Sequence, residues 1–376
     1  MPVNPVDFFK QLTSHNVDFF TGIPDSLLKE FCLCIDDYIP KRQHIIAANE
    51  GNAIALAAGY HLATKKIPLV YMQNSGLGNA INPLLSLCAR EVYGIPLLVL
   101  IGWRGEKGIN DEPQHIKQGK IQIDLLDTMD IPYKIISKDS LKYKTIISSA
   151  IQIAKNENIP VVILIKKGTF SKYIRNIDQS DNHQMMREEA LEIILKKLEK
   201  NTIIVSTTGK TSREIFEIRE NKGQSHQQDF LTVGSMGHCS SIALGIALAK
   251  PHRQVVCIDG DGAMLMHLGS LTSIASLKPK NFRHILMNNE VHESVGGQAT
   301  AAKEINLSAI VEALGSSKIF KAETPEELKA NISKFVMCSG PAFLEVKICS
   351  GSRENLGRPT IKPSQNKENF MRFLKK

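Results

Sequence analysis

The sequence predicts an α/β protein made of two doubly wound parallel-sheet domains, with no middle domain between them. Two observations support this fold class. Short apolar segments of strand length alternate with segments of helix length, which is the pattern of a parallel sheet covered by helices. The alternation stops once, near residue 170, and restarts near residue 188. A chain of 376 residues is long enough for two such domains, each with its own core.

The first half is expected to form one parallel sheet. Apolar residues predict strands at 17–20, 44–48, 69–73, 97–101, 133–136 and 161–165. Helices are expected up to residue 35, at 50–64, at 76–90 and up to about residue 155, with Asp25 or Ser26 as a cap of the first helix. Pro83 falls inside the third helix and should lie near its start or kink it. Residues 102–119 are expected to form a long polar loop.

The second half repeats the alternation after a linker. Residues 171–187 lack apolar periodicity and contain turn-forming residues, so we expect a linker there, between domains 1–170 and 188–376. Strands are predicted at 203–206, 231–233, 255–258 and 285–289, and helices at 189–200, 212–220, 240–249 and 263–276. Segments 309–314, 318–320, 326–336 and 342–348 complete the domain, and a polar tail ending in a short helix follows Gly351.

Composition and charge exclude several classes of protein. Hydrophobic residues make up 43% of the chain, but no apolar run approaches the length of a membrane helix. The N-terminus lacks the basic and apolar regions of a signal peptide, and the seven cysteines have no metal-like spacing. We therefore expect free thiols and a cytoplasmic location. The net charge of +8 is spread over helices where lysines alternate with glutamates, which favours a small anionic substrate over nucleic acid.

Polar residues follow two of the predicted strands in the second half. The strand 255–258 leads into Gly260-Asp261-Gly262, and the strand at 285 leads into Asn288-Asn289. Because the carboxyl ends of parallel strands share one rim of the sheet, both groups should lie together. The oxygens of Asp261, Asn289 and the Val291 carbonyl suit a hard cation such as Mg²⁺. Gly260 and Gly262, together with the helix N-terminus at Ala263, would let a phosphate approach the backbone closely.

This stretch resembles the thiamine diphosphate signature, with a spacer of 25 residues, 263–287, between Gly262 and Asn288. The resemblance implies thiamine diphosphate and Mg²⁺ as cofactors. It also implies that domain 1–170 binds the pyrimidine and domain 188–376 the diphosphate. A plain turn after a strand is the alternative, but the spacing and the paired asparagines favour the cofactor.

Glu50 stands at a predicted strand-to-helix junction, in Asn49-Glu50-Gly51. On its own, a carboxylate there would be explained by the helix dipole. Beside the first motif it resembles the glutamate of the pyrimidine-binding domain in thiamine enzymes. That glutamate hydrogen-bonds N1′ of the aminopyrimidine and helps to generate the carbon nucleophile, so the resemblance implies a catalytic role for Glu50.

Two further turns are candidates for the diphosphate-binding domain. In Gly234-Ser235-Met236, the resemblance implies a carbonyl that accepts from the cofactor's amino group and a methionine that props the cofactor in its bent form; a core methionine is the alternative. Thr208-Gly209-Lys210-Thr211 contains a Gly-Lys-Thr string, but a P-loop would need glycine where Ile204 stands. We expect Thr208, Gly209 and Thr211 to contact the diphosphate.

Several strings across the chain resemble the phosphonopyruvate decarboxylase family, which shares its pattern with sulfopyruvate decarboxylases. The strings are 21–28, 102–106, 111–115 and 292–298, and the family's usual proline is missing near Lys107. The resemblance implies decarboxylation of 3-phosphonopyruvate to phosphonoacetaldehyde and CO₂, in phosphonate biosynthesis. The alternatives are sulfopyruvate decarboxylation or, further away, a carboligase of the acetolactate synthase type, which usually needs a middle domain.

The same strings supply candidate residues for the substrate. Arg104 is expected to bind the phosphonate in a fork, with Lys107 and Gln114 nearby, unless Arg104 pairs with Glu106 or Glu112. Candidates for proton transfer are Asp25, which could instead only cap a helix, and His115 and His292, which could instead be surface loop residues. Asn74, at a strand end, is a candidate to line the cofactor or the substrate.

The resemblance also implies a homo-oligomer, at least a dimer, with the active site at the subunit interface. Glu50 and Asp261 would then come from different subunits. A nucleotide-dependent dehydrogenase is disfavoured, because the Gly76-Leu77-Gly78 string lacks the third glycine and the acidic residue of a dinucleotide site. A non-catalytic binding module would have no need of Glu50.

Overall fold

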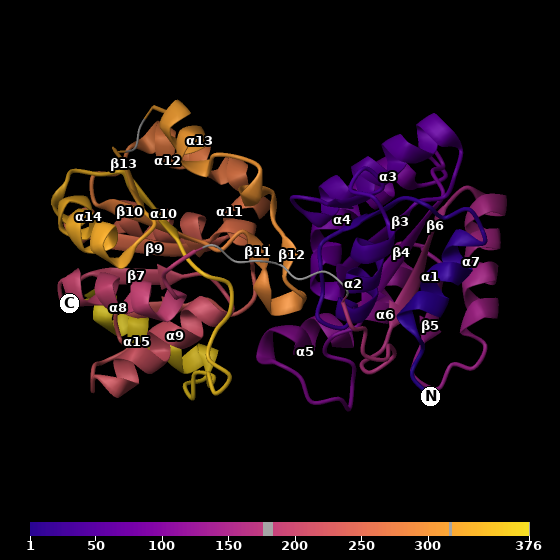
Figure 1. The fold of residues 1–376 in the computed structure, drawn as a ribbon, viewed down its shortest axis with the longest axis horizontal. Coiled ribbons are helices and arrows are strands. Elements are labelled where there is room, and N and C mark those ends of the chain that lie inside the picture. The colour runs from indigo at the N-terminus through magenta and orange to yellow at the C-terminus, as the bar shows by residue number, and fades with distance from the viewer. Residues whose placement is uncertain (176–182, 316–317, 376) are drawn as a thin grey trace. The chain divides into compact units, whose positions relative to one another are not determined.

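The computed structural model describes residues 1–175, 183–315 and 318–375. The chain divides into two compact units, Met1–Gln179 and Ser180–Lys376. Each unit contains a six-stranded sheet whose neighbouring strands all run parallel, so the predicted α/β class with two parallel sheets is confirmed (Figure 1). The predicted linker 171–187 includes 176–182, which lie outside the described residues, so the domain boundaries stay a prediction.

The sheet of the first unit has the strand order β2-β1-β3-β4-β6-β5. Its strands are β1 (Phe20–Gly22), β2 (His44–Ile46), β3 (Leu69–Gln73), β4 (Leu97–Gly102), β5 (Tyr133–Ile136) and β6 (Pro160–Ile165). Its helices are α1 (Pro5–Thr13), α2 (Lys29–Tyr38), α3 (Glu50–Thr64), α4 (Leu77–Pro83), α5 (Pro113–Lys120), α6 (Gln122–Thr128) and α7 (Tyr143–Glu157). Every residue of β4 and β6 is buried, as expected of interior strands covered on both faces.

Local sequence explains where the first unit departs from prediction. The expected polar loop 102–119 is wrong in part, because Pro113 begins α5, a position where its missing N–H costs nothing. Helix α1 was not expected, although Asn4 caps it and Pro5 starts it. The predicted helix 76–90 is broken: α4 ends at Pro83 and a π-helical turn, η2 (Leu84–Cys88), follows. The strand predicted at 17–20 is displaced: β1 begins at Phe20 and ends at Gly22.

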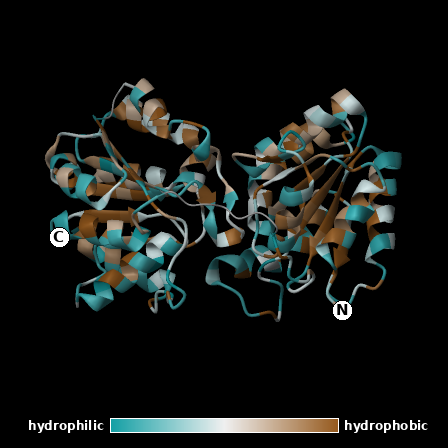
Figure 2. Cartoon of the chain, in the orientation of Figure 1, coloured by the Kyte–Doolittle hydropathy of each residue, from teal (hydrophilic) through white to brown (hydrophobic). Residues whose placement is uncertain are grey.

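The sheet of the second unit has the strand order β13-β14-β10-β9-β7-β8. Its strands are β7 (Ile203–Ser206), β8 (Asp229–Leu231), β9 (Val255–Gly260), β10 (Phe282–Asn288), β13 (Lys318–Ala322) and β14 (Ala342–Lys347). Its helices are α8 (Arg187–Lys197), α9 (Lys210–Asn221), α10 (Cys239–Ala249), α11 (Asp261–Met266), α12 (Leu271–Leu277), α13 (Leu307–Ala313), α14 (Pro325–Met337) and α15 (Pro363–Lys375). Apolar residues concentrate in the strands of both sheets (Figure 2).

The second unit corrects two predictions and adds one element. The helix predicted at 263–276 is split into α11, a short 3-10 turn η3 (Leu268–Ser270), and α12. The strand predicted at 231–233 ends at Leu231 instead. A small antiparallel hairpin, β11 (Val291–His292) with β12 (Gln298–Ala299), follows β10 and was not predicted. This hairpin matters because it carries residues expected at the metal site.

Two further expectations concern the whole chain. All seven cysteines are free, which confirms the predicted free thiols. Among the described residues, no helix combines the length and the apolar character needed to cross a membrane.

Candidate functional site

The carboxyl ends of β9 and β10 bring the two polar motifs of the second unit together. In the register of these strands Gly260 lies beside Met287, so Asp261 and Asn288 leave the sheet next to each other. Asp261 is the first residue of α11, and α11 contacts β11. The chain after Asn289 turns through Glu290, whose φ of 61° is left-handed, into the hairpin.

Asp261 has the environment of a carboxylate that receives a cation. It is buried, and its Oδ2 accepts a hydrogen bond from the Thr300 hydroxyl. Burial raises the pKa of Asp261 to about 6, because the charged form is poorly solvated there. Within the described part of the chain Asp261 forms no ion pair. A bound divalent cation would supply an opposite charge in direct contact with Asp261.

Asn289 and Val291 supply the other expected ligands. The Asn289 Oδ1 accepts from the Val291 backbone N–H at 3.3 Å, and its Nδ2 donates to Glu293 Oε2 at 3.0 Å. The expected metal ligands are the Asn289 Oδ1, the Val291 carbonyl and the Asp261 carboxylate. All of these ligand atoms are oxygens, which suits Mg²⁺ rather than a softer metal. The residue set thus fits the expected cation, and its role stays a prediction.

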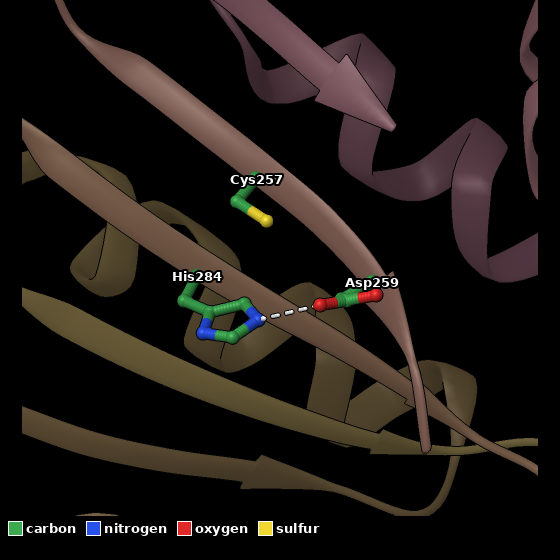
Figure 3. Close-up of side chains that lie close together, drawn as sticks. All are labelled: Cys257, Asp259 and His284. Atoms are coloured by element: carbon green, nitrogen blue, oxygen red, sulfur yellow. Dashed lines mark ion pairs between the residues drawn. The ribbon is translucent and has the colours of Figure 1, made fainter. Parts of the chain in front are cut away.

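A second group of metal-ligating types lies deeper in the sheet and does not suit Mg²⁺. Cys257 and Asp259 lie on β9, and His284 lies beside them on β10, all buried (Figure 3). The His284 Nε2 and Asp259 Oδ2 form an ion pair at 3.6 Å. Burial raises the pKa of the Cys257 thiol well above its ordinary value, so it stays protonated and is a poor ligand. We therefore interpret this group as a buried polar contact within the sheet.

Gly262, Met236 and His292 meet beside the metal motif. A Cβ on Gly262 would lie 2.9 Å from His292 Cε1, so that ring would have to shift, and 3.5 Å from Met236 Cε, an ordinary contact. Met236 is only partly buried and is not a core residue, contrary to the alternative. His292 is partly buried in β11 rather than on a surface loop, and burial lowers its pKa to about 4. Ala263 is buried in α11.

The turns at 207–211 and 234–236 lie side by side. The Gly234 N–H donates to Thr208 Oγ1 at 3.1 Å, and a Cβ on Gly260 would lie 3.9 Å from Thr207. Gly209 caps α9 with a φ of 101° that favours glycine, and Thr211 is buried in the first turn. Gly234 and Ser235 both have a left-handed backbone conformation, so the chain turns sharply at these two residues. The free N–H groups at the start of α9 could receive an anion.

Glu50 occupies a fixed position in the first unit. It is the first residue of α3, follows the cap Asn49, and is 5% exposed. Its Oε2 accepts from Asn79 Nδ2 at 2.8 Å, and a Cβ on Gly76 would lie 2.2 Å from its Oε1. Burial raises the pKa of Glu50, which the Asn79 hydrogen bond only partly offsets. The helix dipole alone therefore does not account for this carboxyl group.

Arg104 and Asn74 join the ends of β3 and β4. The Asn74 side chain accepts from the Arg104 N–H at 3.1 Å and donates to its carbonyl at 2.8 Å. The Arg104 guanidinium forks onto Asp111 and donates to Ser26 Oγ at 2.7 Å. Its ion-pair partner is thus Asp111, so the expected alternatives Glu106 and Glu112 are wrong.

Asp25 lies next to this group and is completely buried. Its Oδ2 accepts from the Leu27 N–H at 2.9 Å in the turn before α2, whose N-cap is Leu28, so neither Asp25 nor Ser26 is the cap. Its Oδ1 has no hydrogen-bond partner. Burial raises the pKa of Asp25 to about 6, against the opposing effects of the Leu27 N–H and Arg104. A role in capping alone leaves Oδ1 unexplained.

The three remaining candidates lie on and before α5. His115 is buried rather than on a surface loop, and its Nδ1 has no partner. Burial, and then Arg104, lower the pKa of His115. Gln114 is partly buried with an unpartnered Oε1. Lys107 is exposed and makes no hydrogen bond or ion pair with a described residue, so the structure does not bring it to the group.

Four residues that sequence reasoning did not assign hold these side chains. They are Asn79 beside Glu50, Asp111 beside Arg104, Thr300 beside Asp261 and Glu293 beside Asn289. Asp111 and Glu293 lie within strings that were singled out, which was the available signal. Thr300 had no signal, because it reaches Asp261 only through the unexpected hairpin.

Both halves of the chain match family models. Residues 7–130 match the model described as "Thiamine pyrophosphate enzyme, N-terminal TPP binding domain". Residues 207–346 match "Thiamine pyrophosphate enzyme, C-terminal TPP binding domain". These ranges contain Glu50 and Asp261, respectively.

Similar proteins extend over nearly the whole chain. The chain is 33% identical to a phosphonopyruvate decarboxylase of Streptomyces viridochromogenes, over 99% of this chain and 95% of the relative. It is 32% identical to the phosphonopyruvate decarboxylase of Streptomyces hygroscopicus, over 99% and 94%. Identity falls to 27% with a sulfopyruvate decarboxylase of Methanosarcina acetivorans, over 99% and 97%.

Proposed function

The chain belongs to the phosphonopyruvate decarboxylase family of thiamine pyrophosphate enzymes, and on this premise we propose that it converts 3-phosphonopyruvate to phosphonoacetaldehyde and CO₂. The observation that carries the proposal is the match along both chains to two relatives of that name, at higher identity than to the sulfopyruvate relative. The reaction would belong to phosphonate biosynthesis.

The second unit would hold the cofactor's diphosphate with Mg²⁺. Asp261, Asn289 and the Val291 carbonyl supply oxygen ligands to the cation, and the turns at 208–211 and 234–236 offer N–H and hydroxyl groups. When bound, thiamine diphosphate supplies an electron sink for the charge that departing CO₂ leaves behind. The side chains of Met236 and His292, which lie beside Gly262, would limit the space available to the bound cofactor.

Glu50 would hold a proton at N1′ of the cofactor's pyrimidine. The raised pKa of Glu50 suits this role, because a general acid–base group works best when its pKa lies near the working pH. The hydrogen bond from Asn79 fixes one oxygen and leaves the other for the cofactor.

Arg104 would bind the phosphonate of the substrate. A guanidinium has five N–H donors, and Asp111 and Ser26 take three of them, which leaves two for an oxyanion. Asp25 and His115, with one unpartnered atom each, would exchange the proton that replaces CO₂. We further infer a cytoplasmic homo-oligomer in which Glu50 and Asp261 of different subunits share one site.

The proposal is tested by measuring CO₂ release from phosphonopyruvate, sulfopyruvate and pyruvate, with thiamine diphosphate and Mg²⁺. We expect phosphonopyruvate to be preferred, and Glu50→Gln to lower kcat by about 10²–10⁴-fold. The control is Glu157→Gln, which loses only the exposed ion pair with Arg90. A preference for sulfopyruvate would move the activity to that relative's reaction, and no CO₂ from any substrate would overturn the proposal.

A further inference from the structure

A cluster of paired charges lies against the metal loop of the second unit, by which we mean residues 289–291 after β10 with the expected ligands Asn289 and Val291. Its members alternate in sign and are mostly buried: Arg187 on α8, Lys210 and Glu214 on α9, and Glu293 after β11. Arg187 donates to both oxygens of Glu214, at 2.8 and 3.0 Å. The cluster is neutral overall, and none of its members was assigned a role by the sequence.

Glu293 is the member that reaches the metal loop. Its Oε2 accepts from Arg187 Nη1 at 2.8 Å and from Asn289 Nδ2 at 3.0 Å, and its Oε1 accepts from Lys210 Nζ. Three donors thus converge on the two oxygens of one carboxylate. Two of the three donors belong to cations, the Arg187 guanidinium and the Lys210 ammonium.

A carboxylate contacted by two cations offers only acceptor oxygens, and this property fixes the Asn289 amide. With its NH₂ held by Glu293, the amide presents Oδ1 on the opposite side, where the Val291 N–H also donates to it. The oxygen is the atom that a cation needs. If the amide rotated by half a turn, it would present two N–H donors to the cation instead.

We propose that Glu293 is a positioning residue for the cation: it holds Asn289 with its oxygen toward the metal, and through Lys210 and Arg187 it joins the metal loop to α9. The inference rests on the proposed cofactor site and adds a residue to it. Partners of this kind behind metal ligands orient them and commonly change metal affinity by about 10–100-fold.

The attachment to α9 has a second consequence. Lys210 is the first residue of α9 and Glu214 lies one turn later, so the cluster contacts this helix next to the turn expected to meet the diphosphate. The Lys210 ammonium forms an ion pair with Glu293, which in turn contacts Asn289 of the metal loop. Loss of Glu293 should weaken the binding of the cation more than the binding of the diphosphate.

Isothermal titration of Mg²⁺ into the full chain at saturating thiamine diphosphate tests the inference. In Glu293→Gln one oxygen becomes an NH₂ group that faces a donor, so we expect the Kd of Mg²⁺ to rise about 10–100-fold. The matched control is Glu188→Gln, which loses an ion pair with Arg353 in the same unit. We expect an unchanged Kd for this control.

Two further variants separate positioning from general stability. Glu293→Asp keeps the negative charge between Arg187 and Lys210 but withdraws the carboxylate from Asn289 by one methylene, so the Kd should rise while the melting temperature falls less than in Glu293→Gln. On an Asn289→Ala background, Glu293→Gln should change the Kd little further, because its effect passes through the amide.

Each result has a definite meaning. If Glu293→Gln unfolds, the Asp variant decides. An unchanged Kd in the Asp variant, or equal effects of Glu293→Gln with and without Asn289, would overturn the positioning role while leaving the cofactor site intact. Absence of Mg²⁺ and thiamine diphosphate binding in the wild-type chain would instead overturn the cofactor site, and with it this inference.

Discussion

Asp25 in the first unit and Asp261 in the second are both buried carboxyl groups, and burial raises the pKa of each to about 6. Both follow the end of a parallel strand, β1 and β9 respectively. Their partners differ. Asp261 starts a helix and accepts from the Thr300 hydroxyl, whereas Asp25 accepts from backbone N–H groups, that of Leu27 among them, and its Oδ1 has no partner.

The two aspartates show that a raised pKa does not by itself decide whether a carboxyl group binds a metal or transfers a proton. Near Asp261 the other oriented groups are oxygens, so a cation would complete the site and return the carboxyl to its charged form. Near Asp25 the available cation is Arg104, which is already forked onto Asp111. Asp25 therefore keeps its raised pKa and can carry a proton, while Asp261 is suited to a metal.

Replacing each aspartate by asparagine should separate the two roles most strongly. Asp261→Asn leaves the cation short of a negative charge, and we expect a loss of about 4 kcal/mol, or roughly 10³-fold, in Mg²⁺-dependent affinity for thiamine diphosphate. Asp25→Asn should change this affinity by only a few-fold. Calorimetric titration of both variants measures the difference. Equal losses in the two would break the distinction drawn between them.

The dependence of stability on pH should reveal the proton on Asp25. Its folded pKa of about 6 exceeds the unfolded value, so the folded chain holds a proton that unfolding releases. Wild-type stability should therefore fall, through this group, as pH rises from about 4 to above 6, by about 3 kcal/mol in total.

The Asp25→Asn variant has no carboxyl group at this position and so lacks the pH-dependent contribution to stability. Its stability relative to wild type should therefore improve as the pH rises. Thermal unfolding of both proteins between pH 5 and 8 covers about half of the expected change. Asp261 is present in both proteins, and its contribution cancels. Parallel pH profiles would show that Asp25 is ionised throughout.

The strands and the strand-end motifs were predictable because their signals are local. β4 and β6 are uninterrupted apolar segments, and two motifs that follow neighbouring parallel strands must share a rim. Helix α5 was missed because it buries only His115 and Gly119, so it carries no apolar periodicity.

The hydrogen-bond and ion-pair partners of the site residues were harder to predict than the places of these residues in the fold. The sequence placed Arg104 near acidic residues but could not select Asp111 over Glu106 or Glu112, since the choice depends on the path of the loop between β4 and α5. In the same way Thr300 reaches Asp261 only because the hairpin β11–β12 folds back. Loops without periodicity leave such contacts undetermined until the backbone is known.

Two glycines allow each unit to be perturbed sterically. A Cβ in Gly76→Ala would lie 2.2 Å from Glu50 Oε1, and one in Gly262→Ala 2.9 Å from His292 Cε1. We expect Gly76→Ala to displace the Glu50 carboxyl, lower kcat and cost about 1–3 kcal/mol of stability, without changing cofactor affinity. Gly262→Ala should raise the Kd of the cofactor. Steady-state kinetics measure kcat, and calorimetry measures the Kd of the cofactor. If Gly76→Ala instead raised the Kd and Gly262→Ala instead lowered only kcat, the roles assigned to the two units would be contradicted.

The smallest expected effect concerns the substrate anion. Arg104→Lys removes the fork that pairs with Asp111 and replaces it by a point charge, so we expect the KM for phosphonopyruvate to rise about tenfold, or roughly 1.5 kcal/mol. Arg90→Lys, in the exposed pair with Glu157, is the control. Because a phosphonate can carry two negative charges and a sulfonate one, the rise should be smaller for sulfopyruvate. An equal rise for pyruvate, which has no second anion, would show that the Arg104 side chain acts by holding Asp111 and Ser26 in place rather than by binding the phosphonate.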